Sequence, residues 1–125
     1  MIRNRDNVRP YVTKDRSTIR ELYHPNNSHV QGFSLAEAEV GAGTWTEAHA
    51  HEKSQEIYYI LEGAGTMRLG GRLLAVKPGD AVLVPPGVPH NIKAERGSGI
   101  RILCACCPPY SHEDTRLTGS GEETF

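Results

Sequence analysis

The chain lacks several features that mark whole classes of protein. Its 125 residues contain 14 Lys and Arg against 15 Asp and Glu. This balance provides neither a basic surface for nucleic acid nor a long acidic tail, and no segment has a helix-turn-helix pattern. No apolar run approaches the ~20 residues that span a bilayer, and the charged N-terminus is not followed by the apolar stretch of a secretory signal. These absences predict a soluble, cytoplasmic protein with no nucleic acid or membrane partner.

Cysteine is scarce and clustered. The three residues are Cys104, Cys106 and Cys107, an odd number on one expected strand, which is not the pattern of a disulfide framework. No second cysteine-rich segment is present to complete a structural zinc site. Two interpretations stay open, namely that the thiols are small buried hydrophobic groups or that one of them lines a metal cavity.

Helix-forming patterns are almost absent. One short helix is expected at residues 18–23, where Ser17 would cap it and Ile19, Leu22 and Tyr23 would form an apolar patch. From residue 32 onward, short runs rich in Val, Ile, Leu and Tyr alternate with Gly and Pro at spacings of about ten residues, which predicts strands. We expect them at 32–40, 43–51, 55–62, 64–69, 72–77, 80–84, 89–94 and 98–107.

The length fits a single domain. We predict an N-terminal arm over 1–31, a barrel over 32–107 and a C-terminal extension over 108–125. Within the extension, 111–114 would form a turn or short helix and 118–125 a frayed tail. Regular short strands without long helices are typical of a sandwich or a closed barrel, so the expected fold class is all-β.

Three histidines and one glutamate stand out along the predicted strands. His49 and His51 are two residues apart and would project from the same face of a strand. Glu56 opens the next strand, and His90 follows the proline-rich loop 85–89, which is stiff because each proline fixes φ and removes a donor. A set of nitrogen and oxygen donors without thiolate suits iron, manganese, cobalt, nickel or catalytic zinc. We therefore predict one divalent metal ion per chain.

Two stretches of the chain have glycine, histidine and proline at fixed spacings. The first stretch reads Gly43-(five residues)-His49-Ala50-His51-(four)-Glu56-(six)-Gly63. The second reads Gly79-(five)-Pro85-Pro86-Gly87-(two)-His90. They resemble the two motifs of the cupin family, of the small single-domain, cupin 2 conserved-barrel type. The resemblance covers residues 32 to about 107, and its motifs are specific for fold and metal but weak for reaction.

The resemblance implies an antiparallel jelly-roll β-barrel with a metal held by His49, His51, Glu56 and His90. It also implies a homodimer, to which we expect the N-terminal 30 residues and segment 108–110 to contribute. The family usually has Asn four residues after the last histidine, where this chain has Ala94. That departure leaves the ligands in place and removes a polar group from the cavity wall.

Two further residues are candidates for catalysis. Glu47 would share the face of His49 and His51 and act as acid or base, unless it is a carboxylate exposed at the barrel rim. Tyr58 would donate a hydrogen bond into the cavity, unless it only packs in the core. Four protein ligands leave two positions on an octahedral ion, so a metal-dependent dioxygenase, isomerase or lyase acting on a small organic molecule is favoured. A metal-dependent binding or sensing module without turnover is the alternative, because fold does not decide function.

Overall fold

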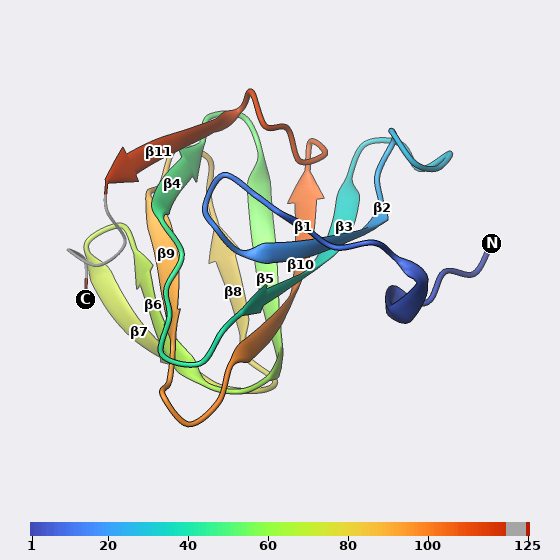
Figure 1. The fold of residues 1–125 in the computed structure, drawn as a ribbon. Coiled ribbons are helices and arrows are strands. Elements are labelled where there is room, and N and C mark those ends of the chain that lie inside the picture. Colours follow the sequence, from blue (N-terminus) through green and yellow to red (C-terminus); the bar gives the residue numbers. More distant parts are fainter. Residues whose placement is uncertain (120–124) are drawn as a thin grey trace.

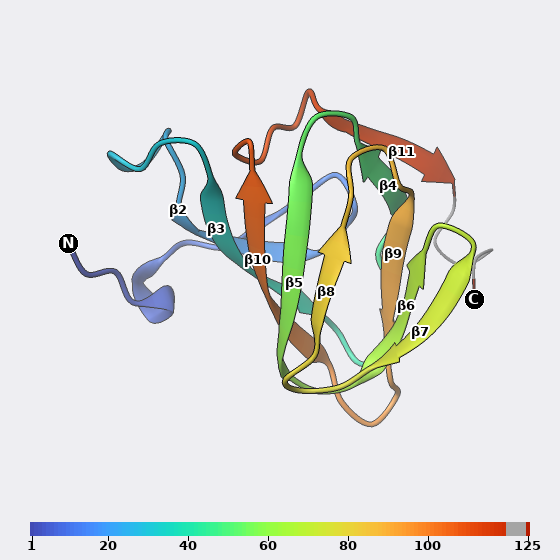
Figure 2. The same cartoon turned by 180° about the vertical axis from the view of Figure 1, so that it is seen from behind.

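The computed structural model describes residues 1–119 and 125 and shows two antiparallel β-sheets that face each other (Figures 1 and 2). One sheet contains, in spatial order, β1 (Tyr11–Val12), β2 (Thr18–Tyr23), β3 (Ser34–Val40), β10 (Ile100–Cys107), β5 (Gln55–Glu62) and β8 (Ala81–Val84). The other contains β11 (Thr115–Gly119), β4 (Ala48–His51), β9 (His90–Ala94), β6 (Gly65–Leu69) and β7 (Arg72–Val76). The all-β prediction is confirmed.

The helix expected at 18–23 is wrong, because these residues form β2. Each of its residues from Thr18 to Glu21 pairs with β3, with Arg20 opposite Glu37. A helix of six residues would be too short to be stable by itself, whereas pairing with β3 satisfies the backbone in both strands. The helical element of the described residues is a 3-10 turn, η1 (Arg5–Asn7), capped by the side chain of Asn4. No helix in the described part of the chain is long and apolar enough to cross a membrane.

The C-terminal segment is also more ordered in its first part than we expected. Residues 113 and 114 form a turn, as predicted for 111–114, and β11 then pairs with β4, placing Thr115 opposite His51. The frayed tail expected from residue 118 is therefore wrong for 118 and 119, and its residues 120–124 lie outside the described residues. Both terminal segments thus add strands to the two sheets (Figure 1).

The interior is filled by alternate residues of the central strands. Inward and outward positions alternate along β5 and β10, as the two-residue period of a strand requires. Ile60 lies opposite Ile102 in this inner row, and both are almost fully buried. Met67 and Ile92 face them from the second sheet and are equally buried. These four side chains belong to one buried apolar cluster, and Ile92 and Ile102 also line the cavity described below.

One glycine is required where the hairpin after β5 approaches the chain before β10. Gly63 has φ of +77°, a left-handed conformation that costs other residues free energy. A Cβ atom there would also collide with the backbone carbonyl of Gly99. The hairpin that follows β5 can therefore approach the chain before β10 only because this position has no side chain.

Candidate metal centre

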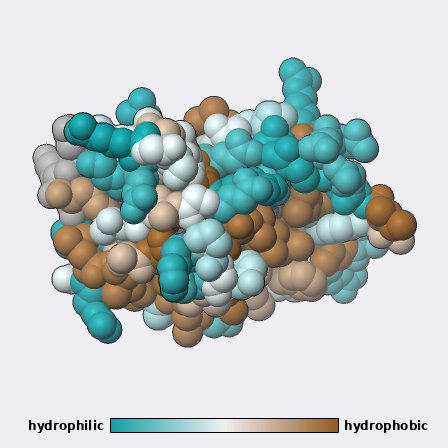
Figure 3. Space-filling model, turned by 90° about the horizontal axis from the view of Figure 1, so that it is seen from below, coloured by the Kyte–Doolittle hydropathy of each residue, from teal (hydrophilic) through white to brown (hydrophobic). Residues whose placement is uncertain are grey.

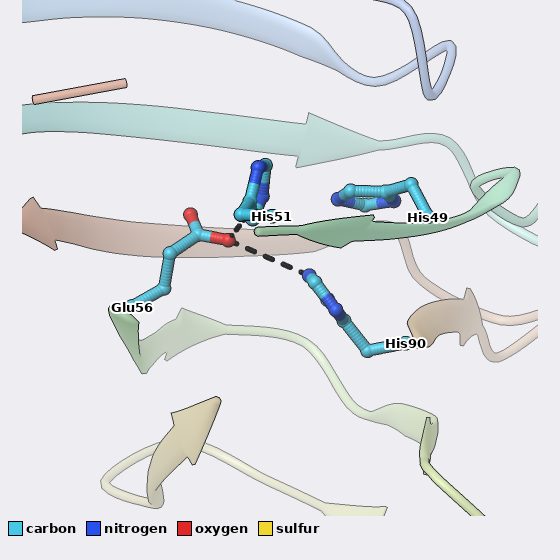
Figure 4. Close-up of side chains that lie close together, drawn as sticks. All are labelled: His49, His51, Glu56 and His90. Atoms are coloured by element: carbon cyan, nitrogen blue, oxygen red, sulfur yellow. Dashed lines mark ion pairs between the residues drawn. The ribbon is translucent and has the colours of Figure 1, made fainter. Parts of the chain in front are cut away.

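The two sheets bring four potential ligands together inside the barrel. His49 and His51 project from β4 toward the same side, as their spacing predicts, and His90 at the start of β9 pairs with His49. Glu56 reaches them from β5 of the facing sheet. All four are buried, and one ligand atom from each lies within 4.8 Å of the others. Figure 4 shows the four side chains converging on one volume.

The histidines are oriented by hydrogen bonds from their other ring nitrogen. His49 Nδ1 donates to the carbonyl of Glu47 at 2.9 Å, and His90 Nδ1 to the carbonyl of Val88 at 2.9 Å. A carbonyl oxygen can only accept, so Nδ1 carries the hydrogen in both rings and Nε2 offers its lone pair to the centre. Val88 belongs to the proline-rich loop, which therefore sets the direction of His90 as expected.

His51 is oriented by a strand that the sequence did not reveal. Its Nδ1 lies 3.1 Å from Oγ1 of Thr115 on β11. The Thr115 hydroxyl donates its own hydrogen to the carbonyl of Ser111 at 2.8 Å, so it accepts from His51. Such outer hydrogen bonds fix the tautomer and direction of a metal-binding imidazole. All three Nε2 atoms thus face the same point.

The unsatisfied atoms at this point fit a cation. Glu56 Oε1 lies 2.7 Å from His51 Nε2 and 3.4 Å from His90 Nε2, contacts that are dashed in Figure 4. Among the described residues, however, neither Glu56 Oε1 nor His90 Nε2 has a hydrogen bond of acceptable geometry, although both are buried. Buried polar atoms are nearly always satisfied, and a divalent ion between them would satisfy both.

The electrostatics leave the group ready to bind a cation. Burial lowers the pKa of His49, and the neighbouring His90 lowers it further. Burial alone would raise the pKa of Glu56, but its contacts with His51 and His90 outweigh that effect and lower it to about 2. For His51, burial lowers the pKa, yet the contact with Glu56 prevails and the net shift is upward. At neutral pH Glu56 is therefore ionised, and a metal bound here would compete with a proton for Nε2 of His51.

An internal cavity lies next to these ligands. It is narrow, since the volume open to the centre of a water molecule is about 60 Å³. Alternate residues of the β1–β2 hairpin line it together with β3 and β10 of the same sheet, and β4, β9 and β11 contribute from the facing sheet. The loop of this hairpin, drawn in blue in Figure 1, reaches the residue before β4, where the Glu47 amide donates to the Asp15 carbonyl at 2.8 Å. The N-terminal segment therefore covers the metal centre.

Asp15, at the tip of that hairpin, lines the cavity and faces His49. The sequence did not indicate this role. Its Oδ1 accepts from the hydroxyls of Thr13 and Ser17, each at 2.6 Å, and from the Ser17 amide at 2.9 Å. Its Oδ2 is left facing His49 Nε2 at 3.8 Å. The only local signal was the Asp-x-Ser turn chemistry, because the contact joins residues 34 positions apart in the sequence.

The two predicted catalytic residues lie in different environments. Tyr58 is buried, lines the cavity, and has its ring centroid 5.9 Å from that of His90. Glu47 does not line the cavity, and its carboxylate lies 3.4 Å from Arg16 on the outside. The reason is that β4 begins only at Ala48, so the alternation assumed for residues 43–51 does not extend back to Glu47. Its backbone, rather than its side chain, serves the site by orienting His49.

The cysteines divide between the two interpretations left open by the sequence. Cys104 and Cys106 are buried and also line the cavity, whereas Cys107 is exposed. Burial raises the pKa of the Cys104 thiol well above its usual range and that of Cys106 to about 12. Neither cysteine belongs to the convergent group of ligands. Their thiols are therefore protonated and form part of the apolar wall of the cavity.

This geometry agrees with comparisons to known proteins. A model of the family described as cupin domain matches residues 36–106, and the chain therefore belongs to the cupin family. The uncharacterized protein MJ1618 of Methanocaldococcus jannaschii is 50% identical over 112 residues, which are 90% of each chain. The oxalate-binding protein of Thermotoga maritima is 29% identical over 75 residues, 60% of this chain and 62% of its own length.

A solved structure covers the terminal segments as well. The polyketide cyclase RemF from Streptomyces resistomycificus is similar with a TM-score of 0.81 and 27% identity, over 99% of this chain and 89% of its own. The similarity therefore includes the N-terminal hairpin and β11, which lie outside the residues matched by the family model.

Proposed function

We propose that this protein is a metal-dependent enzyme that acts on a small organic molecule in the cavity beside His49, His51, Glu56 and His90. The observation that carries the proposal is the convergence of three oriented Nε2 atoms and one carboxylate. Two atoms of this group, Glu56 Oε1 and His90 Nε2, are buried and lack hydrogen bonds among the described residues. The names of the polyketide cyclase and the oxalate-binding protein refer to small organic molecules, and a cavity lies beside the four side chains in this chain too.

The chain's own residues would bind the ion and handle protons. When bound, an ion at this place would polarise a substrate oxygen or lower the pKa of a water molecule. Asp15 presents Oδ2 on the cavity side of His49, where it can accept a proton from a substrate beside the centre. The Tyr58 hydroxyl belongs to a ring that lines the same cavity, and burial raises its pKa well above the usual range. It would therefore act as a hydrogen-bond donor and not as a base.

These positions favour a reaction in which a proton is moved next to a metal-polarised group, as in isomerases and lyases. If the native metal is iron, the dioxygenase predicted from the ligand types is the favoured reaction instead. The identity of the native ion thus distinguishes between the remaining reaction types.

The first test is the metal content of the purified protein by mass spectrometry. We expect about one equivalent of a divalent ion per chain, and its loss in the His49→Ala/His51→Ala variant. The matched control is the His29→Ala/His112→Ala variant, because both of those side chains are exposed and neither belongs to the ligand group. A parent protein that binds no metal after reconstitution would contradict the proposal.

The second test separates an enzyme from a binding module. Turnover of a substrate by the loaded protein should fall at least tenfold in Asp15→Asn while the metal content is unchanged. Saturable ligand binding with no product from any loaded form would instead support the non-catalytic sensing alternative. Glu47→Gln is the control, since its carboxylate does not line the cavity and the main-chain bond to His49 is retained.

We also propose that the protein is a homodimer in the cytoplasm. The outer face of β5 and β8 exposes Ile57, Tyr59 and Leu83 by 44–55%, with Ile57 paired to Leu83. In the view from below, apolar surface is extensive in the middle and lower part of the molecule (Figure 3). A second copy would cover these side chains, so Leu83→Glu should yield a monomer in light scattering coupled to size exclusion, and a parent that is monomeric already would refute the dimer.

A further inference from the structure

Apart from histidines, the ionisable residues of the cavity with a formal charge are all acidic. Its lining includes the carboxylates of Asp15, Glu21 and Glu56, and no Lys or Arg of the described residues contributes to it. A divalent ion held by Glu56 would leave one positive charge in a cavity whose other two formally charged side chains are the carboxyl groups of Asp15 and Glu21. A small dicarboxylate in this cavity would therefore face carboxylates without a compensating guanidinium or ammonium group.

Glu21 has an unused acceptor, as Glu56 does at the metal centre. It lies on β2, and its Oε2 accepts from the Tyr11 hydroxyl at 3.1 Å. Its Oε1 is buried and has no hydrogen-bond partner among the described residues. A buried carboxylate oxygen without a donor is unfavourable, so this atom marks a place where a ligand donor would be bound.

The sheet places Glu21 three strands away from Tyr58, whose ring neighbours that of His90. In register, Glu21 pairs with Ala36 on β3, Ala36 with Cys104 on β10, and Cys104 with Tyr58 on β5. Three strand spacings correspond to roughly 14 Å between the backbones of Glu21 and Tyr58. The two side chains between them are small, which leaves the space that forms the cavity.

Glu21 also lies where the cavity meets the surface. Tyr11, Glu21 and Tyr110 line both the internal cavity and a surface groove between the β1–β2 hairpin and residues 109–113. Of these three residues, Tyr110 lies beside the candidate metal centre, with its ring centroid 6.0 Å from that of His51. Glu21 is thus positioned to contact a ligand where the cavity meets the groove.

We propose that Glu21, held by Tyr11, is the specificity-determining residue of this cavity and selects neutral or cationic molecules that donate a hydrogen bond from a hydroxyl or amino group. The opposite end of such a molecule, on the order of 10 Å away by the strand spacing, would lie beside His49, His51, Glu56 and His90. Small dicarboxylates such as oxalate would be rejected, in contrast to what the name of the Thermotoga maritima relative states of that protein. This inference rests on the proposed metal centre.

A matched series of catechols tests the proposal, because the catechol end can bind a metal and only the tail differs. The probes are dopamine with an ammonium tail, 3,4-dihydroxyphenylethanol with a hydroxyl tail, and 3,4-dihydroxyphenylacetate with a carboxylate tail. Their dissociation constants would be measured by calorimetry on the zinc-loaded protein, with oxalate as a fourth ligand. We expect the ammonium and hydroxyl tails to bind at least tenfold more tightly than the carboxylate tail and than oxalate.

Two variants assign the selection to Glu21. Glu21→Gln keeps the size of the side chain and should reduce the preference for the ammonium tail over the carboxylate tail at least fivefold. Glu95→Gln, which removes an exposed carboxylate outside the cavity, should leave the preference unchanged. A purely structural Glu21 would lower the melting temperature and weaken all probes alike, which would overturn the proposal.

The outcomes also separate this inference from the proposed function. Metal binding together with equal or tighter binding of the carboxylate tail would overturn the role of Glu21 and leave the metal centre intact. Failure of the three catechols to bind a metal-loaded protein would overturn it as well, since the cavity would not admit such molecules. A protein that binds no metal would refute the proposed function itself, and this inference with it.

Discussion

The hydrogen bond from His51 to Thr115 should control metal affinity from outside the ligand group. Thr115→Val keeps the shape of the side chain but removes the hydroxyl that accepts from His51 and donates to the carbonyl of Ser111. Loss of an outer partner of a metal-binding histidine typically reduces metal affinity about 10- to 100-fold, which corresponds to about 1.4–2.8 kcal/mol. The variant also leaves a buried imidazole N–H without an acceptor, which costs about 1–3 kcal/mol of stability.

The assay is competition with a chromophoric chelator, which measures the dissociation constant of the metal directly. Thr118→Val is the matched control, because Thr118 is exposed on the same strand and has no contact with the histidines. We expect the affinity of Thr115→Val to fall at least tenfold and that of Thr118→Val to stay within twofold of the parent. Equal affinities for both variants would show that β11 does not orient His51.

Three further predictions concern the fold, the thiols and acid. Gly63→Ala should lower the free energy of unfolding in urea by more than about 1–2 kcal/mol, because left-handed strain alone costs that much and the added Cβ would collide with backbone atoms. Gly71→Ala is the control and should cost far less, because position 71 has open space and no positive φ. With a thiol reagent at pH 8, the exposed Cys107 should react quickly. Cys104 and Cys106 should react only when the protein unfolds, since burial raises the pKa of both thiols. Equal reaction rates for the three thiols would contradict this prediction. Metal should be released as pH falls, because the ligands bind only when unprotonated, and an affinity independent of pH between 5 and 7 would exclude these ligands.

Acid should also destabilise the metal-free protein through Glu56. Its pKa in the folded state is lowered to about 2, below the usual value of about 4.3 for an unfolded chain. A lowered folded pKa means that the carboxylate stabilises the protein above the unfolded value, and that this contribution is lost as pH falls from about 4.3 to 2. Denaturation of Glu56→Gln should show a shallower dependence over this range, and parallel curves for parent and variant would contradict the assignment.

Local patterns predicted most of the barrel. The strands of the central segment follow from apolar alternation and from turns at Gly and Pro, because a half-buried strand requires inward positions every second residue. His49 and His51 share a face for the same reason, and Glu56 follows at the start of the next strand. These features depend on neighbours only a few residues away, whereas His90 was assigned to the same site from its donor type and from the resemblance of its loop to the second cupin motif, and it meets His49 through the pairing of β4 with β9.

The errors lie where tertiary pairing decides. Residues 18–23 carry a pattern compatible with a short helix, but pairing with β3 makes them a strand. Glu47 was placed on the ligand face by extending the alternation of β4 beyond its first residue, Ala48. The roles of Asp15 and Thr115 depend on contacts with His49 and His51 across 34 and 64 positions of the chain, and no local rule predicts contacts at that separation.

The sequence by itself determined the fold class and the types of metal ligand, because both are written in residue identity and short-range spacing. Only the tertiary structure decided which side chains surround those ligands. It brought the N-terminal hairpin with Asp15 and Glu21 over the cavity, and β11 with Thr115 behind His51. The physical reason is that these terminal strands find their partners through hydrogen bonding to sheet edges far along the chain, and the chemistry of the cavity follows from that pairing.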